Sequence, residues 1–212
     1  LSNAKTGHAH SPGLAKRESA LTLSRMVHFT LFGIPVYIRP SFWVVLAIFG
    51  GALSISSVED LIYPALFVIA GFIAILSHEM GHALVGRRLG GGQQTIVLEL
   101  FGGLTSSHGM QLTRGGRALM ILAGPMMTLL LGIISLWLTW NIVAPVMASH
   151  NLDFWDLAIS PFTAALISPK LYILSCLIMI GEWWTLLNLL PIYPLDGGQL
   201  IAQDIRSPGK YS

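Results

Sequence analysis

The sequence predicts an all-α polytopic membrane protein with about four transmembrane helices and a membrane-associated β-strand or hairpin between the second and third. Of its 212 residues, 53% are hydrophobic and only 10% are charged, and the mean hydropathy is +0.68. A soluble domain carries roughly 25% charged residues. These values exclude a disordered chain and argue against a soluble globule, which would lack the polar residues to cover its surface.

Four charge-poor stretches define the expected spans, because a span needs about 20 largely apolar residues. They run over 41–57, 61–77, 118–143 and 171–190, and the last is interrupted only by Glu182. All four are long for buried strands and too apolar on every side for surface helices. The preceding stretch, 27–38, is β-branched and apolar, and we expect an interfacial strand or loop there.

The distribution of basic residues predicts the orientation. A cytoplasmic N-terminus places every Lys and Arg except Lys170 on the cytoplasmic side, and it places four acids in the outside loops: Glu59, Asp60, Asp153 and Asp156. The positive-inside rule selects this topology. We therefore expect a multi-pass integral protein of a prokaryotic cell membrane. The net charge of +2 gives no reason to expect a nucleic-acid partner.

Between the second and third spans, 94–107 is β-branched and apolar and contains Gly102-Gly103, which predicts a strand followed by a turn or bulge. Lipid cannot satisfy open backbone groups, so this segment must rest on protein or line a wet cavity. Its strand at 94–101 could pair with an extended peptide by β-addition. A structural hairpin packed on the third span is the alternative.

A metal-binding pattern stands at the end of the second span, where residues 78–82 read His-Glu-Met-Gly-His. Residues four apart lie on one face of a helix, so His78 and His82 can reach one metal ion. Glu79 lies beside that face. The single cysteine, Cys176, excludes a multi-Cys metal site. The alternative is a histidine pair satisfied by interhelical hydrogen bonds, but an ionisable group inside a span favours a functional site.

A third ligand is expected from 188–198, because a catalytic zinc usually has three protein ligands. Pro191 and Pro194 stop the fourth helix, and we expect Gly197 and Gly198 to permit backbone angles unavailable to other residues. Asp196 would then lie on unwound backbone at the end of a span. The other acids inside or near spans are Glu99, in the expected hairpin, and Glu182, near the middle of the fourth span. Asp196 is the better candidate because its neighbours break the helix around it.

These motifs resemble those of the site-2 protease family of intramembrane zinc metalloproteases. The resemblance rests on Gly33-Ile34-Pro35, His78-Glu79-x-x-His82, Phe101-Gly102-Gly103, Ala123-Gly124-Pro125 and Asn188-x-x-Pro191-x-x-Pro194-x-Asp196-Gly197-Gly198. It implies one zinc ion held by His78, His82 and Asp196, with Glu79 as the catalytic acid/base. It also implies a transmembrane-helix substrate cut within or near the bilayer. The chain departs from many members after Ala-Gly-Pro, where Met126-Met127-Thr128 stands in place of a polar Asn.

On this interpretation residues 27–206 form the intramembrane metalloprotease core, between a mobile tail at 1–26 and a C-terminal tail at 207–212, with truncation of a longer chain as an open alternative. We take Asn188, Gly102 and Gly103 as candidate substrate-binding residues. For Asn188 a helix–helix hydrogen bond is an equal alternative. The bilayer and the substrate helix are the expected partners, and the sequence does not predict an oligomeric state.

Three other functions stay open at this stage. The chain could be a catalytically silent relative that binds membrane helices, although the intact Glu79 argues against this. It could be a metal-binding or metal-transport protein, for which we would expect acids and histidines along several spans. A membrane-embedded prenyl-protein protease is a third possibility, but its second metal motif lies on another helix. Iron or cobalt could bind the same ligands as zinc.

Overall fold

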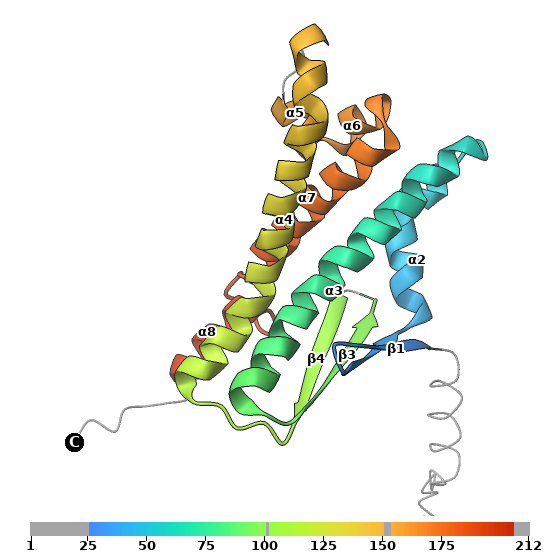
Figure 1. Ribbon diagram of the computed structural model, residues 1–212. Helices are drawn as coiled ribbons and strands as arrows, with labels where there is room; N and C mark the ends of the chain where they lie inside the picture. Colours follow the sequence, from blue (N-terminus) through green and yellow to red (C-terminus); the bar gives the residue numbers. More distant parts are fainter. Residues whose placement is uncertain (1–25, 101, 151–153, 206–212) are drawn as a thin grey trace, which may run out of the picture.

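The computed structural model describes residues 26–100, 102–150 and 154–205 (Figure 1). The expected tails at 1–26 and 207–212 lie outside the described residues except for residue 26, and so does Phe101. The described chain is mostly helical and carries one small sheet at one end of the helices (Figure 1).

Within the described residues, three helical segments are long and apolar enough to cross a membrane: Glu59–Gly90, Arg114–Ala144 and Pro169–Asn188. They belong to α3 (Ile62–Gly90) with the short turn η2 (Glu59–Leu61) before it, to α4 (Arg114–His150) and to α7 (Pro169–Asn188). These correspond to the second, third and fourth expected spans. The short helices α5 (Phe154–Ile159) and α6 (Pro161–Ile167) connect α4 to α7.

The first expected span differs from the prediction. In place of a continuous helix over 41–57, α2 covers only Pro40–Phe49 and is followed by the short turn η1 (Ala52–Ser54). Ten residues of helix reach about 15 Å, half of the hydrocarbon core. The helix ends at Gly50-Gly51, where Gly51 has a φ of +88°, a conformation that favours glycine. In the part of the chain described, three helices reach the length of a span, and the expected count of about four transmembrane helices stays a prediction.

The protein is mostly helical, as expected, and its small sheet has more strands than the expected hairpin. Its four strands are β1 (Val27–Leu31), β2 (Ile34–Ile38), β3 (Gln93–Glu99) and β4 (Gly102–His108), in that spatial order. The β1–β2 and β3–β4 pairs are antiparallel, and β2 pairs with β3 in parallel. The two β-branched segments recognised in the sequence therefore join in one sheet. The position of the sheet relative to a membrane stays a prediction.

One face of the sheet is buried. The alternating residues Ile34, Val36 and Ile38 of β2 and Ile96 and Leu98 of β3 pack in one core with α2 and α3. This alternation is the two-residue period of a strand with one buried face. Figure 1 shows the sheet beside the C-terminal half of α3.

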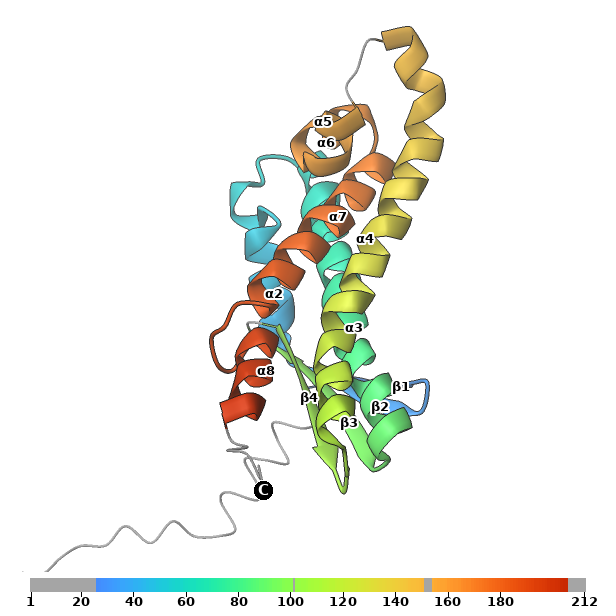
Figure 2. The ribbon, with the colours of Figure 1, turned by 90° about the vertical axis from the view of Figure 1, so that its left-hand side faces the viewer.

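The long helices α3 and α4 run side by side in both views (Figures 1 and 2). Gly81 of α3 permits this approach, because a Cβ there would collide with the carbonyl oxygen of Ala123. After Ala-Gly-Pro, Thr128 makes a polar contact between helices: its Oγ1 lies 2.6 Å from Oγ1 of Thr185 on α7. The helix α8 (Asp196–Ile205) lies near the start of α4 (Figure 2).

Candidate metal centre

The two histidines of the 78–82 motif converge. Both lie on α3, where a spacing of four residues places them on one face. Their Nε2 atoms are 3.0 Å apart, and both residues are buried. The structure therefore brings the pair together as the sequence predicts.

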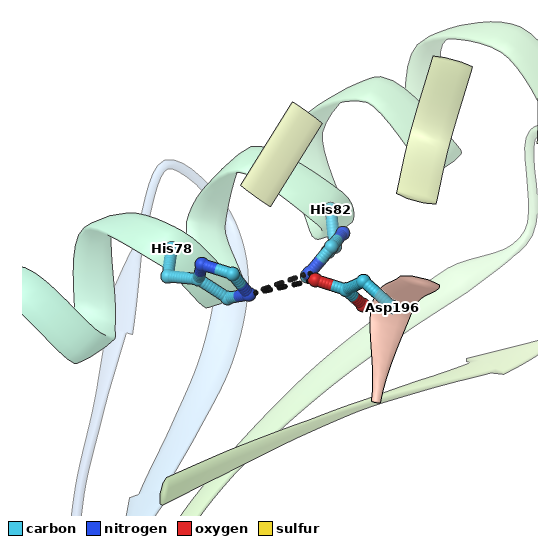
Figure 3. A group of neighbouring side chains, drawn as sticks. All are labelled: His78, His82 and Asp196. Atoms are coloured by element: carbon cyan, nitrogen blue, oxygen red, sulfur yellow. Dashed lines mark hydrogen bonds and ion pairs between the residues drawn. The ribbon is translucent and has the colours of Figure 1, made fainter. Parts of the chain in front are cut away.

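Asp196 joins this pair from the other end of the described chain. Its Oδ2 lies 3.1 Å from Nε2 of His78 and 3.3 Å from Nε2 of His82 (Figure 3). One ligand atom from each of the three residues lies within 4.8 Å of the others, close enough to hold one metal ion. All three residues are buried.

The backbone that presents Asp196 differs from the expectation. The helix α7 ends at Asn188, before Pro191 and Pro194, as predicted, but Asp196 is the first residue of a new helix, α8. It therefore does not lie on unwound backbone. Asp196 lies outside the three long helices.

Gly197 and Gly198 have a different role from the one predicted. Neither has a positive φ among the residues described, so no special backbone angle requires glycine there. A Cβ on Gly197 would collide with the backbone of Leu189, and a Cβ on Gly198 with the backbone of Ile192 and Tyr193. These glycines allow the start of α8 to pack against the connection that leads to it, which brings Asp196 to the histidines.

The residues present fit a zinc ion. Nδ1 of His82 donates to the carbonyl oxygen of Met120 over 2.8 Å, and in a neutral imidazole this leaves the lone pair on Nε2. Such an outer hydrogen bond is typical of a metal-binding histidine. Two ring nitrogens 3.0 Å apart beside a carboxylate oxygen need a shared proton or a cation between them. Two imidazoles and one carboxylate are a common zinc ligand set that leaves one coordination position open.

Gly124 of α4 makes room for this ligand set. A Cβ at Gly124 would collide with Nε2 of His82 and would lie 2.8 Å from Nε2 of His78. The motif Ala123-Gly124-Pro125 is one of those that carry the family resemblance. The structure adds that its glycine faces the coordinating atoms.

Glu79 lies next to the ligands and is held from the sheet. Thr105 of β4 donates through Oγ1 to Oε2 of Glu79 over 2.8 Å. Gly103, two residues earlier on β4, faces the same side chain, because a Cβ there would lie 2.7 Å from Oε1 of Glu79. The strand β4 therefore donates a hydrogen bond to one oxygen of this buried carboxylate and leaves room for its side chain at Gly103.

A cavity of about 540 Å³ opens in front of these groups. Its lining includes His78, Glu79, His82 and Asp196, together with apolar side chains from α2, α3, β4, α4 and α7. The candidate substrate-binding residues Asn188, Gly102 and Gly103 also line it. Asn188 donates through Nδ2 to the carbonyl oxygen of Trp184 on its own helix over 2.9 Å.

The two other acids of the spans stand apart from the ligand set. Glu99 pairs with Arg39 at 3.0 Å, where the inner strands β3 and β2 end, and both side chains are partly exposed. Glu182 is exposed on α7 and does not line the cavity. Among the described residues, Asp196 is the acid that meets both histidines.

Sequence reasoning missed two residues of the site. Thr105 is one residue in a polar stretch, and no pattern in the sequence distinguishes it from Ser106 or Ser107. The backbone carbonyl of Met120 could not be recognised in the sequence, because every residue has a backbone carbonyl. Gly124 was within a recognised motif, but its contact with the imidazoles follows only from the crossing of α3 and α4.

The chain is similar to known proteins over most of its length. It is 27% identical over 174 residues to a zinc metalloprotease from Methanocaldococcus jannaschii, covering 82% of this chain and 43% of that protein. It is 29% identical over 184 residues to a provisionally named zinc metalloprotease from Synechocystis sp., covering 81% of this chain and 42% of that protein. The chain thus spans less than half the length of these curated relatives.

A solved structure has a related fold. The site-2 protease from Methanocaldococcus jannaschii superposes with a TM-score of 0.58 at 24% sequence identity, over 88% of this chain and 74% of that chain. The family model described as peptidase family M50 matches residues 66–207, a range that contains His78, Glu79, His82 and Asp196. Because this match covers more than half of the chain, the chain belongs to peptidase family M50, which confirms the resemblance to site-2 proteases drawn from its motifs.

Proposed function

We propose that this chain is a zinc-dependent intramembrane endopeptidase that hydrolyses a peptide bond of a transmembrane-helix substrate. The observation that carries the proposal is the convergence of His78, His82 and Asp196 beside Glu79 in one cavity. That cavity is bordered by helices long and apolar enough to cross a membrane. Membership of peptidase family M50 supports the same reaction class.

His78, His82 and Asp196 would hold the zinc ion. When bound, zinc supplies Lewis acidity, which makes water more acidic and polarises a carbonyl group. Glu79 accepts a proton from the attacking water and passes it to the leaving amine. The hydrogen bond from Thr105 keeps the carboxylate of Glu79 beside the ligand set for both transfers.

The cavity favours an apolar substrate. Phe42 and Leu46 of α2, Ile75 of α3 and Leu187 of α7 are among its lining residues. A helical substrate hides its amide groups in its own hydrogen bonds, so it must unwind before its carbonyl group can be attacked. An extended segment would then need new backbone partners.

The strand that would supply those partners is β4, which corrects the expectation for 94–101. The strand in that stretch, β3, lies between β2 and β4 and has no free edge. The edge strands are β1 and β4, and β4 lines the cavity through Gly102, Gly103 and Thr105. Addition of a substrate strand to β4 would satisfy the exposed amides of both chains.

The orientation proposed from the charges agrees with the placement of the site. Arg87 and Arg88 lie in the last turn of α3, and Arg114 begins α4, at the end that carries the sheet. Glu59 lies at the opposite end of the same helical segment. We propose that the N-terminus and the sheet-bearing end face the cytoplasm, and that water reaches the site from that side.

The test is hydrolysis by the purified chain in proteoliposomes supplied with zinc. A labelled transmembrane peptide should be cut at an internal bond, while zinc entry into the vesicles should equal that of protein-free controls. Zinc flux without cleavage would support the metal-transport alternative. Peptide binding without cleavage would support the catalytically silent alternative.

A further inference from the structure

The strand β4 contacts the side chain of Glu79 through Thr105, whose Oγ1 lies 2.8 Å from Oε2 of Glu79. At Gly103 the strand leaves room for the same side chain, because a Cβ there would lie 2.7 Å from Oε1 of Glu79. Both residues belong to the same face of one strand, because side chains alternate along β4.

The hydroxyl of Thr105 has one proton and two acceptors within reach. Its Oγ1 lies 3.2 Å from the backbone oxygen of Glu79 and 2.8 Å from Oε2. The shorter contact is to the carboxylate, and hydrogen bonds to charged groups are the stronger ones. The hydroxyl of Thr105 therefore donates its proton to the hydrogen bond with the carboxylate, and this bond fixes the orientation of the Glu79 carboxylate.

We propose that Thr105 is a positioning residue for hydrolysis: it holds Glu79 in the orientation needed for proton transfer and fixes it relative to the edge strand that borders the substrate cavity. This inference rests on the proposed function. Thr105 does not touch the ligand set in the described contacts; it acts through Glu79. Because β4 also lines the cavity, the carboxylate and a peptide lying on that strand share one rigid support.

The test compares Thr105→Val, which keeps the shape of the side chain and removes the hydroxyl, with Thr105→Ser, which keeps the hydroxyl. Loss of a hydrogen bond to a charged group costs about 1.5–3 kcal/mol, which corresponds to roughly 10- to 100-fold in rate. We expect Thr105→Val to lower kcat by that factor with KM and zinc content unchanged. Thr105→Ser should restore most of kcat.

Thr95→Val is the matched control. Thr95 lies on the neighbouring strand β3, opposite Ser106 in the register, and it does not line the cavity. The same substitution there should leave kcat unchanged. If Thr105→Val and Thr105→Ser both lower kcat, or if KM rises with kcat constant, the hydroxyl does not position Glu79 and the proposal is wrong.

A second measurement does not depend on hydrolysis. The infrared carboxylate band of Glu79, identified in labelled protein by its loss in Glu79→Gln, should shift in Thr105→Val and stay in place in Thr95→Val. If the wild type cuts the peptide and Thr105→Val cuts it equally fast, the positioning role is wrong and the proposed function stands. If the wild type cuts no peptide, the proposed function fails; the infrared band then decides alone whether Thr105 orients Glu79.

Discussion

Gly124 on α4 faces the Nε2 atom of His82 on α3 so closely that a methyl group at residue 124 would occupy the space of the imidazole ring. The crossing of the two helices thus shapes the ligand set. We expect Gly124→Ala to displace both imidazoles and to lower bound zinc to well below one equivalent. Metal content of the purified protein measures this.

Gly132→Ala is the control for that substitution. Gly132 lies on the same helix, and a Cβ there meets no atom within 4 Å. It should keep full zinc content and gain slightly in helix stability, because alanine is favoured over glycine by about 1 kcal/mol. Equal zinc content in the two variants would contradict the assigned role of Gly124.

The contact between α4 and α7 predicts a stability effect. Oγ1 of Thr185 lies 2.6 Å from Oγ1 of Thr128, and Thr128 also donates to the carbonyl oxygen of Pro125 at 2.9 Å. Thr185→Val should lower the free energy of unfolding by about 0.6 kcal/mol, and at most about 1.7 kcal/mol. Detergent-denaturation midpoints measure the change.

Thr139 serves as the control for Thr185→Val, because its hydroxyl makes a hydrogen bond within its own helix. Thr139 donates to the carbonyl oxygen of Ser135, also on α4, over 2.9 Å. Thr139→Val should change the free energy of unfolding less than Thr185→Val, because no bond between helices is lost. The reverse order would show that the Thr128–Thr185 contact does not stabilise the pair of helices.

The free edge of β4 predicts a pattern for proline substitution. Along an edge strand, alternate N–H groups point to the neighbouring strand or away from the sheet. Proline at a position whose N–H points away should preserve the β3–β4 pairing and lower cleavage of transmembrane peptides at least tenfold, about 1.4 kcal/mol. Cleavage and zinc content are measured for each proline variant. Full cleavage activity in all of these variants would exclude strand addition.

Cysteine labelling tests the orientation. The native Cys176 is fully buried, whereas Leu89 near the end of α3 and Leu53 in η1 are 47% and 80% exposed. A membrane-impermeant thiol reagent added to intact cells should label Leu53→Cys and spare Leu89→Cys. After permeabilisation both should react, and the opposite order would place the sheet outside the cell.

Most of the candidate site could be predicted from local patterns in the sequence. The spacing of His78 and His82 fixes their common face on any helix, and Pro191 and Pro194 necessarily end α7 before Asp196. The long helices α3, α4 and α7 follow from apolar length alone. These features depend on neighbours in the sequence, which is why they could be predicted.

The features that could not be predicted from the sequence depend on contacts between segments that lie far apart in the chain. The pairing of β2 with β3 joins residues 36–38 to 96–98, and no local pattern specifies that partner. The same holds for Thr105 and Glu79, and for Gly197 and Gly198, whose need for glycine comes from the backbone packed against them. The early end of α2 after Phe49 was overlooked because apolar composition continues beyond the helix.

The most direct test measures zinc content and peptide cleavage together in the wild type, Glu79→Gln and Asp196→Ala. We expect the wild type to hold one zinc ion and cut, Glu79→Gln to hold zinc without cutting, and Asp196→Ala to lose both. Because Glu79 would transfer protons without being a ligand, its replacement separates zinc binding from cleavage, whereas replacement of Asp196 does not. An Asp196→Ala protein that keeps a full equivalent of zinc, or a Glu79→Gln protein that still cuts, would contradict the proposed metal centre.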